Sequence, residues 1–406
     1  MSVMKKLALL GVTAVFTVVA AGAALAADPV DVADLKVGAI YIGDEQEGYT
    51  MAHMDGIAEM KEALGLSDDQ VIEKFNIPED ESCYDAAVDL AEQGCQLIIA
   101  NSFGHEDYLF QAASEYPDVQ FCHATGYQAA GSDLENVHNY FTSIYEARYV
   151  SGVVAGMKLK ELADAGEIAD ENKDEDGNVK IGYVGAFSYA EVISGYTAFY
   201  LGVKSVYPEV AMEVSYTGSW ADQALEKETA QSLIDRGCIL IGQHADTTGA
   251  AAACEAAGVW QVGYNVSMLD VAPNVSLTSS TNNWGPYYEY AANSVVAGDE
   301  IDVDWCKGHS EGSVDITELG QNVAEGTQEK VDEVWAALDD GSLHVFDTTT
   351  FTVGGEEMTT TATDDLADFY NGVEYIQDGY FAESTVASAP SFDTIIDGIT
   401  ELDQAF

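Results

Sequence analysis

Two segments of this chain are repeated at nearly the same spacing. The stretch Lys36-Val-Gly-Ala-Ile returns 144 positions later at Lys180 as Lys-Ile-Gly-Tyr-Val, and Leu90-Ala-Glu-Gln-Gly-Cys returns 143 positions later at Leu233 as Leu-Ile-Asp-Arg-Gly-Cys. Two matches in one register indicate that a whole unit is duplicated. The sequence therefore predicts two similar lobes. In open parallel sheets, ligands bind beyond the carboxyl ends of the strands, so we expect a ligand site in the cleft between the lobes.

Each copy alternates short apolar runs with amphipathic stretches. In the first copy the pattern predicts strands at 37–42, 70–75, 96–100 and 119–124, separated by helices at 50–64, 83–93 and 105–115. The second copy repeats this order from residue 180 to about 265. Such alternation is typical of βαβ units and of a parallel sheet covered on both faces by helices, so the fold class is α/β.

The first lobe is expected over residues 27–145, with roughly 284–345 returning to it, and the second over 146–283. Part of 346–406, including a Thr-rich, hairpin-like stretch at 346–358, is expected to recross between the lobes. The charged stretch 167–178 has no apolar face and predicts a solvated loop.

Residues 1–26 have the pattern of an export signal. Lys5 and Lys6 precede an apolar run over 7–23, and Ala24-Leu25-Ala26 is a small-x-small cleavage site. A retained membrane anchor is the alternative, but the run is short for a span and is broken by small residues. The first cysteine is Cys83, so no cysteine stands at the cleavage point to take a lipid. We expect a periplasmic or extracellular protein that is not lipid-anchored.

The charge of the chain is strongly negative. Lys and Arg number 15 against 70 Asp and Glu; removing the signal, with its two lysines and no acid, leaves 13 against 70 and a formal charge of −57. Nucleic acid and anionic lipid need a basic surface and are excluded as partners. Mutual repulsion should destabilise the fold at low ionic strength, which predicts a salt-rich habitat or salt-dependent stability.

The six cysteines leave the disulfide pattern open. Cys83 and Cys95 flank a predicted helix, so their Cα atoms would lie roughly 15 Å apart, too far for a bridge. Cys238 at a strand start and Cys254 late in the following helix are better placed. Otherwise the cysteines are small buried apolar residues.

The motifs of the common catalytic and metal sites are missing or out of context. Gly308-His309-Ser310-Glu311-Gly312 matches a Gly-x-Ser-x-Gly elbow, but an extended run follows it where a hydrolase needs a helix. No His or Cys spacing suits zinc, and no phosphate loop or Gly-x-Gly-x-x-Gly follows a strand. We therefore expect neither cofactor nor metal.

Aromatic and neutral polar side chains follow the predicted strands in unusual number. At the strand ends of the first copy these are Asp44, Tyr49, Asn101, Ser102, Phe103; at those of the second they are Phe187, Tyr189, Glu191, Trp220, His244, Asp246, Thr247 and Asn265; and Trp284 opens the helix after the repeat. Taken singly, such an aromatic could cap the core, and Asp246 could only cap a helix. Their shared position at one end of two sheets favours a flat, purine-like ligand clamped between rings, with its edge read by Asp, Glu and Asn.

The chain resembles the basic membrane protein family, which comprises solute receptors of ABC importers and includes purine nucleoside receptors. The resemblance covers about Lys36 to Ala297. It is carried by runs at 48–56, 94–104, 145–156, 181–187 with Glu191-Val-Ile, 243–247 and 283–287. It implies a type I periplasmic-binding-protein fold, two Rossmann-like lobes joined by hinge crossings, no catalysis, and a membrane permease as partner. A monomer is expected.

By position, the ring-stacking sites of the family correspond to Tyr49, Phe187 and Trp220, and its polar anchors to Glu191 and Asp246. The family usually has Trp or Phe where this chain has Tyr49, which should still stack. Nucleoside-binding members tend to hold the sugar with an acidic residue after the last strand of the second lobe. This chain has Asn265 there, which favours a free base such as adenine over a nucleoside.

The expected function is that of an exported receptor that binds a purine base or purine nucleoside and delivers it to a permease. One alternative keeps the fold and takes another flat aromatic ligand or a sugar. A secreted hydrolase that cleaves nucleosides with Glu191 or Asp246 is a further alternative, but no pair of nucleophile and base can be named for it.

Overall fold

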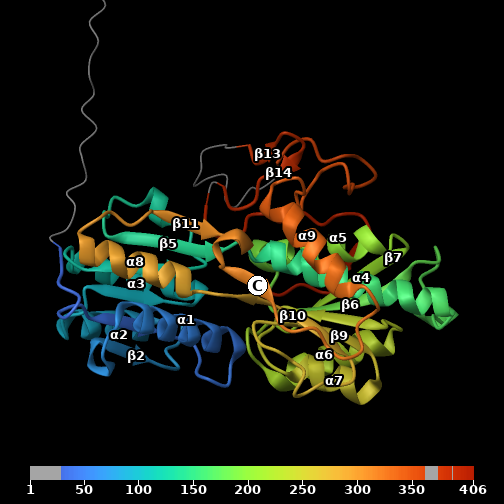
Figure 1. Ribbon diagram of the computed structural model, residues 1–406, viewed down its shortest axis with the longest axis horizontal. Helices are drawn as coiled ribbons and strands as arrows, with labels where there is room; N and C mark the ends of the chain where they lie inside the picture. The colour runs from blue at the N-terminus through green and yellow to red at the C-terminus, as the bar shows by residue number, and fades with distance from the viewer. Residues whose placement is uncertain (1–28, 362–373, 386) are drawn as a thin grey trace, which may run out of the picture.

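Two lobes, each built around its own sheet, lie side by side (Figure 1). The computed structural model describes residues 29–361, 374–385 and 387–406. The predicted export signal at 1–26 lies outside these residues. Within the described part of the chain, no helix is both long and apolar enough to cross a membrane.

The first lobe holds a six-stranded sheet in the order β11-β5-β4-β3-β1-β2, and every neighbouring pair is parallel. Its strands are β1 (Val37–Ile40), β2 (Val71–Lys74), β3 (Leu97–Ala100), β4 (Gln120–Ala124), β5 (Val137–Thr142) and β11 (Asp304–Lys307). Its helices are α1 (Gly48–Leu64), α2 (Glu81–Glu92), α3 (Glu106–Glu115) and α8 (Gly285–Ala297).

The second lobe holds a seven-stranded sheet in the order β12-β10-β9-β8-β6-β7-β15. Its strands are β6 (Val179–Gly185), β7 (Val210–Tyr216), β8 (Leu240–Gln243), β9 (Trp260–Tyr264), β10 (Ser276–Asn282), β12 (Val314–Ile316) and β15 (Ile399–Glu401). Its helices are α4 (Ile144–Ala165), α5 (Ala190–Val206), α6 (Gln223–Asp235), α7 (Gly249–Ala257) and α9 (Thr327–Asp339). All pairs are parallel except that of β10 and β12.

The repeat in the sequence is a repeat in topology. In the first lobe β1 lies between β2 and β3, and in the second lobe β6 lies between β7 and β8 in the same arrangement. The predicted α/β class with two parallel sheets is therefore confirmed. The helices that cover the sheets begin at ordinary caps: the Asp80 carboxylate accepts from Ser82 N at the start of α2, and Asp222 accepts from Ala224 N and Leu225 N at the start of α6.

Helices α4 and α5 pack closely because glycine stands at their contact. A Cβ atom added to Gly152 would lie 2.1 Å from the carbonyl oxygen of Phe199, and one added to Gly202 would lie 2.0 Å from that of Tyr149. This packing fixes the start of α5, which carries Glu191 at the edge of the cleft.

Between residues 29 and 361 the chain crosses between the lobes three times, after β5, after β10 and after β11. The expectation that 284–345 as a whole returns to the first lobe is wrong. Only α8 and β11 lie there; β12 pairs antiparallel with β10, with Ser280 opposite Ile316, and α9 packs on α4. A three-residue strand after an irregular crossing leaves no periodic signal, so the sequence did not reveal this third crossing.

Most of the described part of 346–406 packs on the second lobe, above α5 in Figure 1, and Ser388 reaches the first lobe by donating to Asp304 of β11. The short strands β13 (Ile376–Gln377) and β14 (Tyr380–Phe381) form a hairpin, whereas the predicted hairpin at 346–358 is reduced to one bridge between Val353 and Glu356. Near the carboxyl terminus, β15 pairs with β7 at the edge of the second sheet.

All six cysteines are free thiols, and five of them are buried. The Cys238–Cys254 bridge that the sequence left open is not formed. Both side chains instead belong to the apolar core of the second lobe.

Candidate ligand-binding site

A cavity of about 480 Å³ lies between the two lobes. The first lobe contributes residues that follow β1, β3 and β4 together with Phe141 near the end of β5. The second lobe contributes residues that follow β6, β7 and β8 together with Tyr264, the last residue of β9. The cavity thus opens at the carboxyl ends of both parallel sheets, where side chains from separate loops converge. Its volume is in the range of small-molecule sites.

The lobes touch at the rim of this cavity. Gly48 N, at the start of α1, donates to the carbonyl oxygen of Asp246 in the second lobe at 3.1 Å. Phe103 of the first lobe stacks on Tyr189 of the second, with ring centroids 5.4 Å apart and planes 29° apart. The structure therefore has the cleft closed.

Aromatic rings form most of the apolar wall. Tyr189 and Trp220 stand on the second-lobe side, with centroids 6.1 Å apart, and Phe103 lies 6.1 Å from Tyr127 on the first-lobe side. The hydroxyl of Tyr49 also faces this region; it is buried and has no hydrogen-bond partner among the described residues. Rings at these positions can hold a planar ligand by its faces.

One polar wall is a chain of contacts from Glu191 through His244 to Arg148. His244 Nε2 lies 2.7 Å from Glu191 Oε2, and its Nδ1 lies 3.1 Å from Arg148 Nη2. A guanidinium can only donate, so Nδ1 accepts and Nε2 carries the proton that it donates to Glu191. Burial lowers the pKa of His244; Glu191 opposes this shift, and Arg148 adds to it. The imidazole is therefore neutral, and its Nε2–H holds Glu191 Oε2 in place at the cavity.

Arg148 is a buried cation behind this wall. It is 2 % exposed, donates from Nη1 to the carbonyl oxygen of Gln243 at 2.8 Å, and lies 3.6 Å from the ring centroid of Tyr264. It thus stabilises the acidic site electrostatically without lining the cavity.

Asp246 is the second polar anchor. Its Oδ1 accepts from Asn265 Nδ2 at 2.9 Å, and Asn265 Oδ1 in turn accepts from Asn282 Nδ2 at 3.0 Å. Asn282 also accepts from Thr142, so this network joins two of the lobe crossings to the site. Burial raises the pKa of Asp246 well above its usual range, and the charges of Glu47, Glu226 and Glu191 add to the shift. A ligand that donates hydrogen bonds would stabilise the ionised form.

Two further carboxylates hold the loops of the site. Glu47 caps α1, accepting from Tyr49 N at 3.0 Å and Thr50 N at 2.9 Å. Glu226, fully buried on α6, accepts from the hydroxyl of Thr247 at 2.7 Å and so fixes the loop that carries Asp246. Burial raises the pKa of Glu226 to about 7.

The structure brings together seven of the ten predicted ligand residues. The lining of the cavity includes Tyr49, Asn101, Ser102, Phe103, Glu191, Trp220 and Asp246. Asn101 has its amide engaged, accepting from Ile42 N at 2.9 Å, and Ser102 donates to Glu79 at 2.6 Å. These two therefore shape the first-lobe wall as much as they offer groups to a ligand.

The other three predicted residues do not line the cavity. Phe187 lies behind the wall, stacked on Tyr189 at 5.3 Å and edge-on to Trp220 at 5.0 Å. Trp284 is fully buried in the first-lobe core, stacked on His53 at 4.2 Å, because its backbone packs against Gly56 of α1. Asp44 faces a neighbouring hollow and accepts from Asn76 at 3.2 Å.

The ligand residues predicted from the sequence do not include several residues that line the cavity or support it. Tyr189 and His244 stood at predicted strand ends, and Tyr264 ends β9, so their positions carried the signal. The position of Arg148 in the sequence did not indicate a role in the site, because it lies on a helix that the sequence predicts to be buried. The carboxy-terminal residues Ala389, Pro390, Asp393 and Phe406 also line the cavity, and no strand-end rule points to them.

The site offers no arrangement for a metal ion. No group of three His, Cys, Asp or Glu side chains placed to hold one occurs between residues 29 and 406, leaving aside 362–373 and 386. The Gly-x-Ser-x-Gly stretch forms a short 3₁₀ turn at His309–Glu311 followed by β12, so it lacks the helix that a nucleophile elbow requires.

Comparison with known proteins places this geometry in context. Residues 37–340 match the family described as PnrA-like ABC transporter substrate-binding proteins (Bmp). A purine-binding protein of Brucella abortus is 34% identical over 77% of this chain and 83% of its own length. A putative ABC transporter glucose-binding protein of Haloferax volcanii is 31% identical over 70% of this chain and 66% of its own length.

Among solved structures, a solute-binding protein of an ABC transporter from Conexibacter woesei aligns with a TM-score of 0.61 at 22% identity. The alignment covers 76% of this chain and 98% of that protein. This structural likeness supports the two-lobed fold.

Proposed function

This chain belongs to the Bmp family of PnrA-like ABC transporter substrate-binding proteins, and we propose that its ligand is a purine, with a free base favoured over a nucleoside. The observation that carries the proposal is the pairing of Tyr189 and Trp220 with two carboxyl groups, Glu191 and Asp246, in one closed cavity. A purine offers two aromatic faces to the rings and N–H groups at its edge to the carboxylates.

The charge of the cavity agrees with this ligand. Among the residues that the structure describes, the lining includes carboxyl groups from Glu47, Glu191, Asp246 and Asp393 but no lysine or arginine, and His244 is neutral. A nucleotide or another anion would meet uncompensated repulsion in a buried site. A neutral ligand with N–H donors, such as a purine, would find carboxyl oxygens that accept its hydrogen bonds. The name of the Brucella abortus relative, a purine-binding protein, supports the same class.

The free base is favoured by the position of Asn265. This side chain does not line the cavity; it donates to Asp246 and is held by Asn282. It therefore orients the carboxyl group and is not available to grip a ribose.

A sugar is the second candidate. The Haloferax volcanii relative is named a putative glucose-binding protein, and sugars also stack on aromatic side chains and donate hydroxyl protons to carboxylates. The large number of rings around the cavity favours the purine, since a planar ligand can use two opposed faces at once.

The mechanism is ligand-dependent closure. A ligand that contacts Trp220 and Asp246 in one lobe and Tyr49 and Phe103 in the other binds the closed form better than the open form, and it shifts the population accordingly. We propose that the closed form is the one that docks on the permease and that the protein is exported, monomeric and without catalytic activity.

Titration calorimetry tests the ligand. The protein is unfolded and refolded to remove any bound molecule, then titrated with adenine, guanine, hypoxanthine, adenosine, inosine, AMP and glucose. We expect micromolar or tighter binding of at least one purine base, weaker binding of its nucleoside, and no heat with AMP. Binding of glucose with no response to any purine would establish the sugar receptor instead. Incubation of adenosine or inosine with the protein, followed by chromatography, would reveal base release if the protein were a hydrolase.

A further inference from the structure

The carboxy-terminal segment 387–406 contributes to the cavity although it lies outside the part of the chain that matches the family, residues 37–340. Four of its residues line the cavity, namely Ala389, Pro390, Asp393 and Phe406. In Figure 1 the C-terminus lies where the two lobes meet. The cavity is therefore bounded by the first lobe, the second lobe and this carboxy-terminal segment.

The end of the segment is fastened to the second lobe. Strand β15 runs parallel to β7, with Ile399 opposite Met212, and the Asp403 carboxylate accepts from Ser215 Oγ at 2.7 Å and Tyr216 N at 2.8 Å. Ser188 N donates to the carbonyl oxygen of Ala405 at 2.7 Å. Because Ser188 precedes the ligand-lining Tyr189, this bond places Phe406 at the cavity.

The beginning of the segment reaches the first lobe. Ser388 donates from its backbone N and from its hydroxyl to Asp304 Oδ1, each at 3.0 Å, and Asp304 is the first residue of β11. These bonds connect the segment to the lobe opposite the one that holds β15. The segment therefore contacts both lobes, in addition to the crossings that follow β5, β10 and β11.

The turn between these two attachments is held by buried groups. Glu383, 4 % exposed, accepts from Ser194 Oγ of α5 at 2.7 Å and from Ser391 N at 3.1 Å. Phe392 is fully buried and stacks on Phe346 at 4.6 Å. The backbone of 388–393 is thus fixed in place beside the cavity, which gives Pro390 and Asp393 defined positions toward a ligand.

We propose that residues 388–406 form a third wall of the ligand site, which contacts the ligand and restrains the opening of the lobes. Pro390 supplies apolar cover, and Phe406, which is 81 % exposed, stands at the mouth of the cavity. Asp393 adds a carboxyl group that selects against anionic ligands. The Ser388–Asp304 tie favours the closed form. The role in ligand contact rests on the proposed function, whereas the restraint on opening does not.

The ligand arm of the test compares two variants of the full chain with matched controls. Deletion of Phe406 removes one side chain and leaves β15 intact; Leu402→Ala, at a partly exposed position next to β15, is its control. Asp393→Asn removes the carboxylate; the exposed Glu356→Gln is its control. We expect the deletion to weaken binding of the best purine about fivefold or more with little change in melting temperature, and Asp393→Asn to improve the affinity for AMP relative to adenine about tenfold. Affinities equal to wild type in both variants would overturn the contact role.

The second arm needs no ligand. Small-angle scattering of the ligand-free protein is compared between wild type and Ser388→Ala, with Ser342→Ala as an exposed control. Alanine keeps the backbone N–H and removes the hydroxyl donor to Asp304, so we expect a larger radius of gyration only in the Ser388 variant, and Asp304→Asn should show the same shift. Identical scattering in all four proteins would overturn the restraint. If wild-type protein binds no purine and no sugar while Ser388→Ala still expands, the proposed function fails and the restraint stands.

Discussion

The backbone N–H of Gly48 in the first lobe donates a hydrogen bond to the carbonyl oxygen of Asp246 in the second, at 3.1 Å. The N–H groups in the first turn of a helix have no partner within that helix, so the second lobe satisfies one of them only when the cleft is closed. Asp246 also faces the ligand cavity. Asp246 thus belongs both to the lining of the cavity and to the contact that forms when the lobes close.

A side chain at Gly48 should favour the open form. A Cβ atom there would lie 3.2 Å from the Asp246 carbonyl oxygen and 3.4 Å from Val266 Cγ2, so Gly48→Val would place further atoms into that contact. We expect ligand affinity to fall about tenfold or more, because closure is opposed. Ala58→Val, at an exposed position on the same helix, is the control. Calorimetry measures the ligand affinity of both variants. Equal affinities of Gly48→Val and Ala58→Val would contradict the closure argument.

Tyr189 should contribute more to ligand binding than Phe187. The Tyr189 ring lines the cavity, while Phe187 only supports it from behind at 5.3 Å. Tyr189→Ala should weaken binding about tenfold or more, Phe187→Ala should weaken it less, and Tyr189→Phe should bind nearly as well as wild type since it keeps the ring. A greater loss in Phe187→Ala than in Tyr189→Ala would show that the roles of the two rings are reversed.

Trp284 should matter for stability and not for ligand contact. The side chain is fully buried and stacked on His53, so Trp284→Ala should lower the free energy of unfolding by about 4 kcal/mol. Trp220→Ala, at the partly exposed wall of the cavity, should cost less stability and more affinity. Urea unfolding of the ligand-free variants measures the loss of stability in each, and calorimetry measures the loss of affinity. Trp284→Ala with unchanged stability would place the ring outside the core.

Glu226 should make stability depend on pH. Burial raises its pKa in the folded protein to about 7, above the ordinary value near 4.5. The folded state therefore binds a proton that the unfolded state releases between these values. The resulting stabilisation is complete below pH 4.5 and is lost as pH rises through 7. Glu226→Gln removes this dependence.

Relative to wild type, Glu226→Gln should thus be more stable at pH 8 than at pH 5.5, with a change in the free energy of unfolding between the two conditions of up to about 2 kcal/mol. Urea unfolding at both pH values measures it, and Glu228→Gln, exposed on the same helix, is the control. If the difference in free energy of unfolding between wild type and Glu226→Gln is the same at both pH values, the titration of Glu226 does not affect stability.

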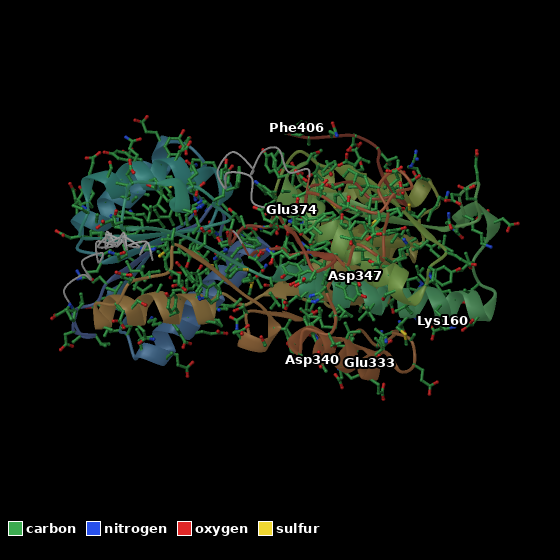
Figure 2. The ribbon with its side chains drawn as sticks, turned by 90° about the horizontal axis from the view of Figure 1, so that it is seen from above. Lys160, Glu333, Asp340, Asp347, Glu374 and Phe406 are labelled. Atoms are coloured by element: carbon green, nitrogen blue, oxygen red, sulfur yellow. The ribbon has the colours of Figure 1, made fainter. Side chains whose placement is uncertain are left out.

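The protein should need salt. Its formal charge is −55 over 406 residues, and oxygen-ended side chains project around the whole outline of the molecule (Figure 2). Salt screens this repulsion, so the melting temperature should rise from dilute buffer to molar potassium chloride. Sucrose at matched viscosity controls for solvent effects that do not depend on charge. A melting temperature unaffected by salt would show that the surface charges do not limit stability.

Periodicity and repetition in the sequence were sufficient to predict the two lobes, their parallel sheets and a cleft at the strand ends. These are local or nearly local properties: an apolar run of four to six residues between amphipathic stretches forms a strand wherever it lies. The loops after the strands then had to converge at one edge, and seven predicted ligand residues, including Trp220 and Asp246, line the cavity there.

The tertiary structure alone decided which side chain of a loop faces the cavity and which faces the core. Phe187 and Tyr189 are two residues apart on one loop and both pack against Trp220, yet only Tyr189 of the two lines the cavity. Trp284 lies in the core because its Cβ and backbone pack closely against Gly56. The third wall depends on contacts such as that of Ser388 with Asp304, 84 residues apart. No local pattern encodes such a pairing, because it exists only once both lobes have folded and brought the two segments together.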